Sequence, residues 1–313
     1  MPTEPIVTIV VPTFNRHARL ARCLDKITQN VTHPHEIIVV DGGSTDRTRP
    51  WLQHVAREVV THADDAALRA PAPATDPRPT EDDDPAPAPD DPHHDRPYPT
   101  LRAIFEPHRQ GAVKAFNRGF RAARGRYVMW LNDDAYPLPG AVDAAVAMIE
   151  RPDLTDVGMI AFYHNWHTPH NVLDRVTHDG TTFELCHVRG YPYANFGLLP
   201  RSLLARVGYA DERFYFFGFD PDLSLKIQIT ESLAVIGCRD ALIAHDEHHD
   251  RRKREDLRAG ADDNRKLFEK WKLPDTGTYP DPAPAYRRML IERGLINARP
   301  RATTPPRHAE SSR

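Results

Sequence analysis

The sequence predicts an α/β fold built on a mostly parallel sheet flanked by helices, and two observations carry this prediction. Short β-branched runs alternate with segments whose apolar residues recur every three to four positions, which is the pattern of β-α-β units. Polar, acidic turns follow two of these runs, where ligands collect in parallel sheets. With 313 residues, the chain can form one large domain or two modest ones.

The N-terminal half is expected to hold four strands with helices between them. Residues 6–11 form a continuous β-branched run, which is typical of a strand buried on both faces. The apolar stripe over 16–29 then predicts a helix. Right-handed crossovers would place the carboxyl ends of all the strands at one edge. The later strands are expected at 37–40, 101–105 and 127–131, and the later helices over 51–59 and 112–123.

The second half reads as a more mixed region. We expect helices over 137–150 and 201–207, strands over 157–163 and 198–200, and irregular hairpins up to His187. Two short apolar runs at 234–237 and 241–244 precede a histidine cluster. The chain is predicted to divide into one half over 1–135, a second half over 136–275 and a partly disordered extension over 276–313. A Pro/Asp-rich insert at about 70–99 is expected to be disordered, because it offers almost no large apolar side chain to bury.

The composition argues against some classes of function. A net charge of -3, with 41 Lys and Arg against 44 Asp and Glu, gives no global basic field for nucleic acid. Cys23, Cys186 and Cys238 lie far apart and form no CxxC pair. No apolar run is long enough to form a transmembrane segment. We therefore expect a cytoplasmic protein, and peripheral contact with the inner face of a membrane remains open.

Four segments, in order, resemble family 2 glycosyltransferases, whose GT-A fold has a Rossmann-like sheet. They read VTIVVPTFNR, EIIVVDGGSTDRT, AFNRGFRAARGRYVMWLNDDAYP and VGYADERFYFFGFDPDLSLKI. The resemblance implies inverting transfer of a sugar from a UDP- or dTDP-linked donor, a nucleotide sugar, to an acceptor hydroxyl. It also implies that the half over 1–135 binds the nucleotide sugar and that the half over 136–275 binds the acceptor and is catalytic. That acceptor would be a glycan, a lipid-linked molecule or another hydroxyl compound, as in surface polysaccharide or glycoconjugate synthesis. The sequence departs from the family pattern in two places, with Phe219 where a glutamate is expected and Asn132 at the start of the metal triplet.

The metal site is predicted at the turn after the fourth strand. A departing diphosphate needs a cation, and carboxylate oxygens suit Mg²⁺ or Mn²⁺. Asp134 is the expected ligand, while Asn132 or Asp133 would orient the ribose or a metal-bound water. The alternative is an ordinary strand-to-turn junction, because Asn and Asp often occupy such ends.

The donor base is expected beside Asp41, which would accept a hydrogen bond from the imide N–H of uracil or thymine. An Asp-Gly turn is the alternative interpretation. Asp46 either contacts the nucleotide or caps the following helix. The other residues expected to bind the donor belong to the first two motifs: Pro12, Thr13 and Phe14 as the pocket wall, with Arg16 and Gly43.

Lys114 and Asn117 lie on one face of a predicted helix, together with Arg118, and could approach the phosphates. A solvated polar face is the alternative.

The resemblance also implies two residues on the acceptor side. Asp220 is expected to be the catalytic base that takes the acceptor proton. It would also be the N-cap of a helix with Pro221 at the first position, and a cap alone is the alternative. His245 is the expected late metal ligand, with His248 in reserve and a surface loop as the alternative. A zinc site formed by His245, His248 and His249 is a weaker hypothesis.

Two rival functions remain. A non-catalytic sugar-nucleotide or glycan-binding module would explain the missing glutamate at position 219. A nucleotidyltransferase would also need a metal and carboxylates, but the sequence lacks the glycine-rich basic loop expected at its start.

Overall fold

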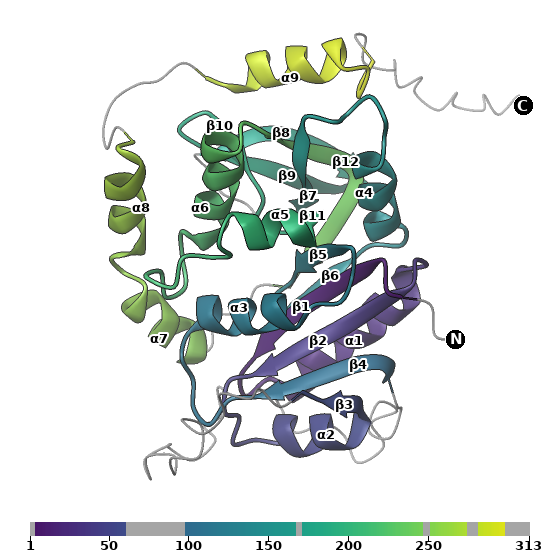
Figure 1. Cartoon of the computed structure of the whole chain (residues 1–313), viewed down its shortest axis with the longest axis vertical. Coiled ribbons are helices and arrows are strands. Elements are labelled where there is room, and N and C mark those ends of the chain that lie inside the picture. The colour runs from purple at the N-terminus through teal and green to yellow at the C-terminus, as the bar shows by residue number, and fades with distance from the viewer. Residues whose placement is uncertain (1–3, 61–97, 167–170, 247–250, 274–280, 298–313) are drawn as a thin grey trace, which may run out of the picture.

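The computed structural model describes residues 4–60, 98–166, 171–246, 251–273 and 281–297. A mixed 12-stranded sheet forms the centre of the molecule, with helices on both faces (Figure 1). Its main path runs β10-β9-β7-β11-β5-β1-β2-β4-β3, and β12, β6 and β8 join beside it. The predicted α/β class is therefore confirmed.

The N-terminal strands run parallel, as predicted. Thr13 pairs with Asp41, and Asp41 pairs with Phe105, so three strands end at the same edge. The buried β-branched run predicted at 6–11 is the central strand β1. The strands are β1 (Val7–Thr13), β2 (His35–Asp41), β3 (Ala56–Val59), β4 (Tyr98–Phe105) and β5 (Tyr127–Trp130), and the helices are α1 (His17–Asn30), α2 (Thr48–Val55) and α3 (Ala112–Ala122).

The predicted helix over 51–59 ends earlier than expected. The chain leaves α2 after Val55, and residues 56–59 pair with β4 as the edge strand β3. Burial alternates along β3, which is the two-residue period of a strand with one covered face. A short segment of this kind cannot be separated from a helix end by propensity alone, because pairing with β4 decides its conformation.

The two sheet faces carry separate cores. One core packs α1, α2 and α4 (Ala141–Ile149) against the sheet, and Leu24, Trp51 and Val142 belong to it. The other core lies under α3, α5 (Arg201–Arg206) and α6 (Phe219–Leu225), with Trp130 and Phe120 among its largest side chains. Because both faces of the parallel part of the sheet are covered, its functional groups are expected at the strand ends.

Antiparallel strands extend the sheet in the second half. The region expected to form irregular hairpins forms the regular pair β8 and β9. The two apolar runs near the histidine cluster form one strand, β12, with an irregularity between Cys238 and Leu242. The remaining strand bounds are β6 (Ala135–Pro137), β7 (Val157–His164), β8 (Val172–His178), β9 (Thr181–Val188), β10 (Tyr191–Tyr193), β11 (Gly197–Pro200) and β12 (Ala234–His245).

Pairing of β12 with β6 positions the late histidine. His245 pairs with Ala135 in antiparallel register, directly after the acidic triplet. The backbone N–H of Asp246 also donates to the carbonyl of Asp134 at 2.9 Å. Two segments that are 111 residues apart in sequence are thereby joined at one sheet edge.

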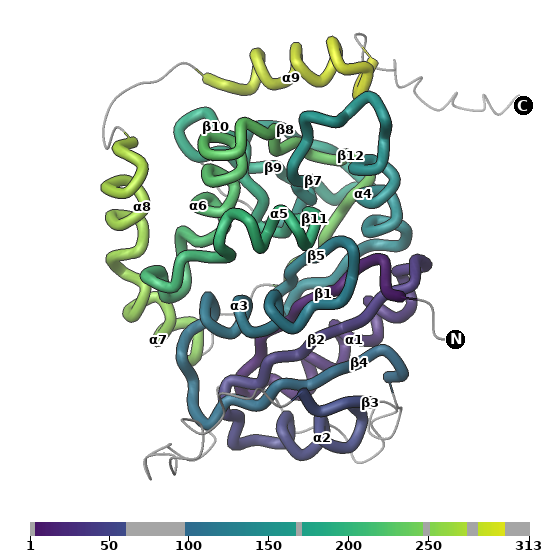
Figure 2. Tube along the Cα trace, viewed as in Figure 1, coloured from purple at the N-terminus to yellow at the C-terminus, as the bar shows by residue number. Residues whose placement is uncertain are grey.

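Three helices follow the last strand: α7 (Arg251–Ala259), α8 (Asp263–Trp271) and α9 (Ala283–Glu292). Figure 2 traces α7 beside the loop between β4 and α3, and α8 alongside α6. In α9, the Tyr286 hydroxyl accepts a hydrogen bond from the backbone N–H of Gly237 at 2.8 Å. Before α7, α6 continues into a short π-helix, η2 (Lys226–Thr230).

Several predictions concern residues outside the described ranges. Most of the Pro/Asp-rich insert and much of the C-terminal extension lie there, as do His248 and His249. Residues 98 and 99, which we assigned to the insert or its edge, belong instead to β4. Within the described ranges, no helix has the length and apolar character needed to cross a membrane.

Candidate functional site

A cavity opens where the carboxyl ends of the parallel strands meet α7. Its volume is about 50 Å³, well below the roughly 300 Å³ of ordinary small-molecule pockets, so lining groups must move apart to admit a nucleotide sugar. Seven of the predicted site residues line it: Pro12, Thr13, Phe14, Asn132, Asp133, Asp134 and His245.

The acidic pair after β5 is buried and held by fixed donors. Thr13 Oγ1 donates to Asp133 Oδ2 at 2.9 Å, tying the end of β1 to this turn. Arg16 Nη1 donates to Asp133 Oδ1 at 3.1 Å and to Asp134 Oδ2 at 2.7 Å. Arg16 is itself only 1% exposed. The structure therefore gives Arg16 a supporting place under the acidic pair and not the open donor-facing position that we expected.

Asp134 also lies against His245. The Nε2 atom of His245 is 3.1 Å from Asp134 Oδ1. Burial by itself raises the pKa of Asp134, but the hydrogen bond and charge of His245, together with the charge of Arg16, hold that pKa well below its ordinary value. Asp134 is thus an ionised carboxylate over the whole physiological pH range, which is the form that binds cations.

The Asp134 and His245 side chains fit one divalent cation. Two ligands at right angles around an ion, each at about 2.1 Å, lie about 3 Å apart, which matches the separation of Oδ1 and Nε2. A carboxylate oxygen with an imidazole nitrogen suits Mn²⁺ at least as well as Mg²⁺. Among the residues that the structure describes, no group of three or more His, Cys, Asp or Glu side chains could hold a metal ion. Further ligands would have to come from the diphosphate and water.

Aromatic rings surround the histidine of this pair. The centroid of His245 lies 5.7 Å from that of Phe196 and 6.2 Å from that of Trp166, both in edge-on geometry. The backbone N–H of His245 donates to Asn165 Oδ1 at 2.7 Å. Rings and backbone together fix the imidazole position, as expected of a ligand that must not reorganise.

The turn after β2 has a rigid backbone. Gly43 has a φ of +87°, and a Cβ there would lie 2.8 Å from the Cα of His108. Only glycine suits this position, so Gly43 shapes the turn. Asp41 is 0% exposed, and its oxygens accept from the Ser44 N–H at 3.1 Å and Arg49 Nε at 2.7 Å. Neither Gly43 nor Asp41 lines the cavity.

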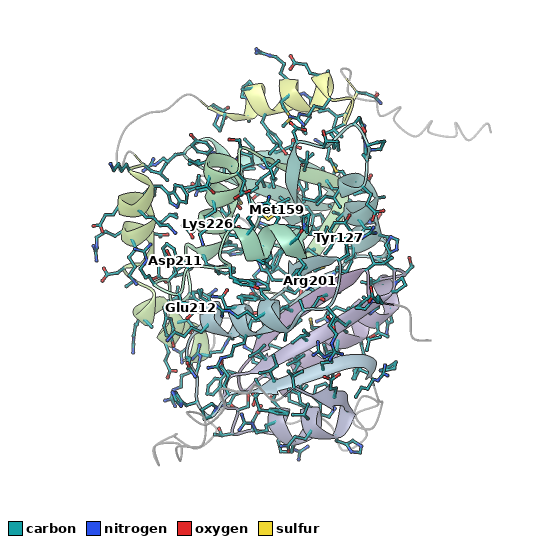
Figure 3. The ribbon with its side chains drawn as sticks, viewed as in Figure 1. Tyr127, Met159, Arg201, Asp211, Glu212 and Lys226 are labelled. Atoms are coloured by element: carbon teal, nitrogen blue, oxygen red, sulfur yellow. The ribbon has the colours of Figure 1, made fainter. Side chains whose placement is uncertain are left out.

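The predicted phosphate-facing residues on α3 do not reach the cavity. Asn117 is buried, and its amide bonds both the carbonyl and the N–H of Ala210, at 2.9 and 3.0 Å. It also donates to Glu212 Oε1 at 2.9 Å, and Figure 3 shows Glu212 beside α3. These bonds fasten α3 to the loop before α6. Lys114 is partly exposed and is not among the lining residues.

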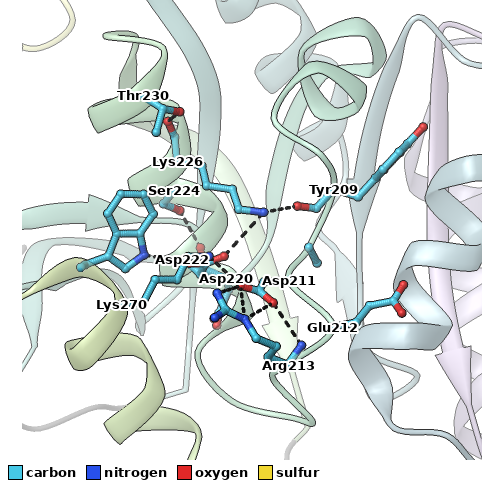
Figure 4. Close-up of polar contacts among 12 residues, drawn as sticks. Tyr209, Asp211, Glu212, Arg213, Asp220, Asp222, Ser224, Lys226, Thr230 and Lys270 are labelled. Carbon is cyan, nitrogen blue, oxygen red and sulfur yellow. Dashed lines mark hydrogen bonds and ion pairs between the residues drawn. The ribbon is translucent and has the colours of Figure 1, made fainter.

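Asp220 lies in the first turn of α6, but it is not the N-cap that we predicted. The helix begins at Phe219 with Gly218, at φ +78°, as its cap residue. Burial raises the pKa of Asp220 to about 7. Figure 4 draws Asp220 near Ser224, whose hydroxyl donates to the backbone carbonyl of Asp220 at 2.8 Å. Asp220 does not line the cavity that contains Asp134.

The helix that carries Asp220 is clamped from two sides. The buried carboxylate of Asp222 accepts from Trp271 Nε1 at 2.7 Å, and Lys270 Nζ lies 2.6 Å from the same oxygen. On the other side, Phe219 packs its ring 5.0 Å from Phe116 and 6.2 Å from Trp130. The residue that replaces the expected glutamate is therefore a core side chain.

The charged residues of the cavity that the sequence analysis missed are Glu106, Arg109, Arg252, Lys253 and Asp256. Arg109 stacks over Phe14 at 5.1 Å and forms an ion pair with Asp256, so it links the pocket wall to α7. Arg252 Nη2 lies 3.8 Å from Asp133 Oδ1, and Lys253 Nζ lies 4.8 Å from the ring centre of Phe216. The basic run that follows the histidine cluster was the available signal for the two α7 cations.

Comparison with known proteins agrees with this architecture. A model of the family described as Glycosyl transferase family 2 matches residues 8–64 and 83–208, which is more than half of the chain. A mannosyltransferase from Pyrobaculum calidifontis, solved with GDP-Man and Mn²⁺, superposes with a TM-score of 0.54 at 18% identity, covering 94% of this chain and 71% of that one. TarS 1-349 from S. aureus with UDP-GlcNAc gives a TM-score of 0.53 at 14% identity, covering 92% and 71%. At these identities, the likeness concerns the fold, which is that of the GT-A glycosyltransferases.

Sequence relatives align over shorter stretches. Glycosyltransferase AglE from Haloferax volcanii is 23% identical over 159 residues, which is 50% of this chain and 39% of AglE. A PGL/p-HBAD biosynthesis glycosyltransferase from Mycobacterium bovis is 46% identical over 44 residues, covering 14% of this chain and 17% of that protein. The chain thus spans less than half the length of these curated relatives.

Proposed function

The chain belongs to glycosyl transferase family 2, and from that premise we propose that it transfers a sugar from a UDP- or dTDP-linked donor to an acceptor hydroxyl with inversion. One observation carries the proposal. Asp134 and His245, from strands far apart in sequence, meet 3.1 Å apart in the cavity that Pro12, Thr13 and Phe14 border. This combination supplies a cation site beside a wall for the nucleotide.

Asp134 and His245 would hold Mn²⁺ or Mg²⁺, which when bound neutralises the charge that develops on the departing diphosphate. The chain contributes cations of its own. Arg252 and Lys253 project from α7 into the same cavity, and Arg109 lies between α7 and Phe14. Such fixed positive groups stabilise a leaving diphosphate in a site shielded from water. We assign the two α7 cations to the phosphates, in place of Lys114 and Asn117.

Asp220 is the proposed base. A carboxylate with a pKa of about 7 is both a competent proton acceptor and partly ionised near neutral pH. Its position in the first turn of a doubly clamped helix fixes the carboxylate relative to the sheet. The acceptor hydroxyl would lose its proton to Asp220 as it attacks the anomeric carbon from the face opposite the diphosphate. Because Asp220 does not line the cavity in this structure, this role requires that the opening of the cavity to the donor also exposes Asp220.

The acceptor would be a glycan, a lipid-linked molecule or another hydroxyl compound, in surface polysaccharide or glycoconjugate synthesis. Trp166 lies beside His245, with Lys253 Nζ 5.9 Å from its ring centre, and offers a flat apolar surface for a sugar ring. A cytoplasmic location, with peripheral contact at the inner face of a membrane, is part of the same proposal.

The test is a transfer assay with UDP-, dTDP- and GDP-sugars, with and without Mn²⁺, that measures the free nucleoside diphosphate. Asp134→Ala should lower transfer at least hundredfold, because it removes a charged ligand from the site. Release of inorganic pyrophosphate would indicate a nucleotidyltransferase instead. Tight donor binding with neither hydrolysis nor transfer would indicate the non-catalytic binding module and would contradict the proposal.

A further inference from the structure

Helix α7 presents charged side chains on two opposite faces. On the inner face, Arg252, Lys253 and Asp256 line the cavity beside the acidic pair. On the outer face, Arg254 and Arg258 lie four positions apart, so they are neighbours on the helix, and both are exposed. Figure 1 shows α7 at the periphery of the molecule, where the outer face can meet a large, flat partner.

The outer face of α7 has an excess of positive charge. Arg251, which is half-buried, joins Arg254 and Arg258 there at helical spacing. Glu255 offsets one of these three charges, because its carboxylate accepts a hydrogen bond from Arg251 Nε at 2.9 Å. Asp256 is only 1% exposed and belongs to an ion pair, so it contributes little to the field outside. This surface is therefore cationic, although the whole chain has a net charge of -3.

Leu257 adds an apolar group to the same surface. It is 38% exposed, and within the described ranges only Val59, Tyr191 and Ile229 are comparably exposed large hydrophobic side chains. Leu257 follows Arg254 by three positions, so the two side chains are neighbours. Arginines beside an exposed leucine suit an anionic bilayer, whose headgroups attract the charges and whose acyl boundary accepts the apolar group. A nucleic acid would satisfy the arginines but offers no such layer for the leucine.

We propose that the outer face of α7 docks on an anionic lipid surface. The inner face of the same helix lines the cavity, and the diameter of a helix is only about 10 Å. Docking therefore holds the cavity close to the headgroups, where an acceptor anchored in the bilayer can reach it. The role given to the cavity rests on the proposed function, which this inference deepens by naming the surface that contacts the membrane.

The experiment is sedimentation of the full chain with vesicles of phosphatidylcholine, either pure or with about one-third phosphatidylglycerol. The wild-type protein should bind the anionic vesicles at least about tenfold more tightly than the neutral ones, and high salt should remove most of this preference. The double variant Arg254→Glu/Arg258→Glu should bind the anionic vesicles at least about tenfold more weakly than wild type. Leu257→Ser should weaken the binding roughly threefold, because it removes the apolar contact alone.

The matched control is Arg287→Glu/Arg288→Glu on α9. Both of these arginines are exposed, and the double variant changes the net charge of the protein by the same amount as the α7 variant. It should bind the anionic vesicles nearly as well as wild type, because its charges lie on another helix.

The inference is overturned if the wild-type protein binds neutral and anionic vesicles equally well, a result that needs no variant to fold. It also fails if the α7 and α9 variants lose binding equally, or if single-stranded RNA displaces the protein from the anionic vesicles. Donor turnover without vesicles tests the proposed function separately. Vesicle binding without any turnover would contradict that function alone, and turnover without vesicle binding would contradict the docking alone, so the two failures can be told apart.

Discussion

Asp220→Asn should abolish transfer and yet stabilise the protein above neutral pH. The aspartate is half-buried in the first turn of α6, and desolvation of its carboxyl group raises its pKa from 3.8 to about 7. The folded protein therefore binds this proton more tightly than the unfolded chain does. Stability from the group is complete below pH 4 and is lost as the pH rises through 7. Asparagine cannot ionise, so the variant does not lose stability over this pH range through residue 220.

The magnitude follows from the two pKa values. A difference between 3.8 and about 7 corresponds to an upper limit of about 4 kcal/mol in unfolding free energy above pH 7. The variant and the wild-type protein should differ little at pH 4, diverge steadily up to about pH 7 and then keep a nearly constant difference to pH 8. Other buried carboxyl groups change the unfolding free energies of the variant and of the wild-type protein alike, so the test is the difference between the two free energies at each pH.

Urea unfolding at pH 4, 5, 6, 7 and 8 measures this divergence, and a transfer assay at each pH measures activity. Asp211→Asn is the matched control with the opposite sign. A hydrogen bond from Arg213 holds the pKa of Asp211 below its ordinary value of 3.8, so this variant should be less stable than wild type by a nearly constant amount from pH 5 to 8, and the gap should close only below pH 4. A constant gap between Asp220→Asn and wild type at all pH values, or near-normal transfer by that variant, would refute the reasoning.

Three further outcomes are expected. Arg252→Ala and Lys253→Ala should each weaken UDP binding about tenfold and UMP binding less, because the two side chains are assigned to the phosphates. Arg258 is exposed on the same helix, and Arg258→Ala should leave the binding of both nucleotides unchanged. Equal losses of affinity for UDP and for uridine would contradict the assignment. Phe219→Glu, which restores the family residue, should lower the free energy of unfolding in urea by several kcal/mol, because it buries a charge between Phe116 and Trp130. Phe219→Leu should lower it clearly less. A glutamate variant as stable as wild type would show that the Phe219 ring is not a core element. Removal of divalent ions with EDTA should stop transfer. His245→Ala should raise the Mn²⁺ concentration needed for a half-maximal transfer rate about tenfold or more. A transfer rate that resists EDTA would mean that Arg16 and the α7 cations suffice without a metal.

Local patterns were sufficient for the first half of the fold. The continuous β-branched run of β1 favours a strand, and the apolar stripe of α1 has the period of a helix. Both elements appear within a residue or two of their predicted bounds. The short strand β3 could not be found in this way. Its conformation depends on pairing with β4, whose partner residues lie about 40 positions along the chain.

The candidate site likewise contains residues that local patterns could place and residues that they could not. Residues at strand ends, such as Thr13 and Asp134, could be placed together because parallel strands finish at one edge. Asn117 and Arg16 carried suitable chemistry in the sequence, but packing turned them toward Ala210 and toward the acidic pair. Side-chain direction is set by neighbours distant in sequence, and no motif records it.

The sequence alone determined the alternation of strands and helices in the first half, the acidic turn after β5 and the family resemblance. These features depend on periodicity and on residue types at neighbouring positions. The family resemblance implied that His245 joins Asp134 at the metal, and the structure places their side chains 3.1 Å apart. Only the tertiary structure decided that α7 brings Arg252 and Lys253 to the same cavity, and that Glu106 is buried there while Asp41 is paired with Arg49. The physical reason is that strand register and helix docking are fixed by long-range packing, which brings together groups that are more than a hundred residues apart.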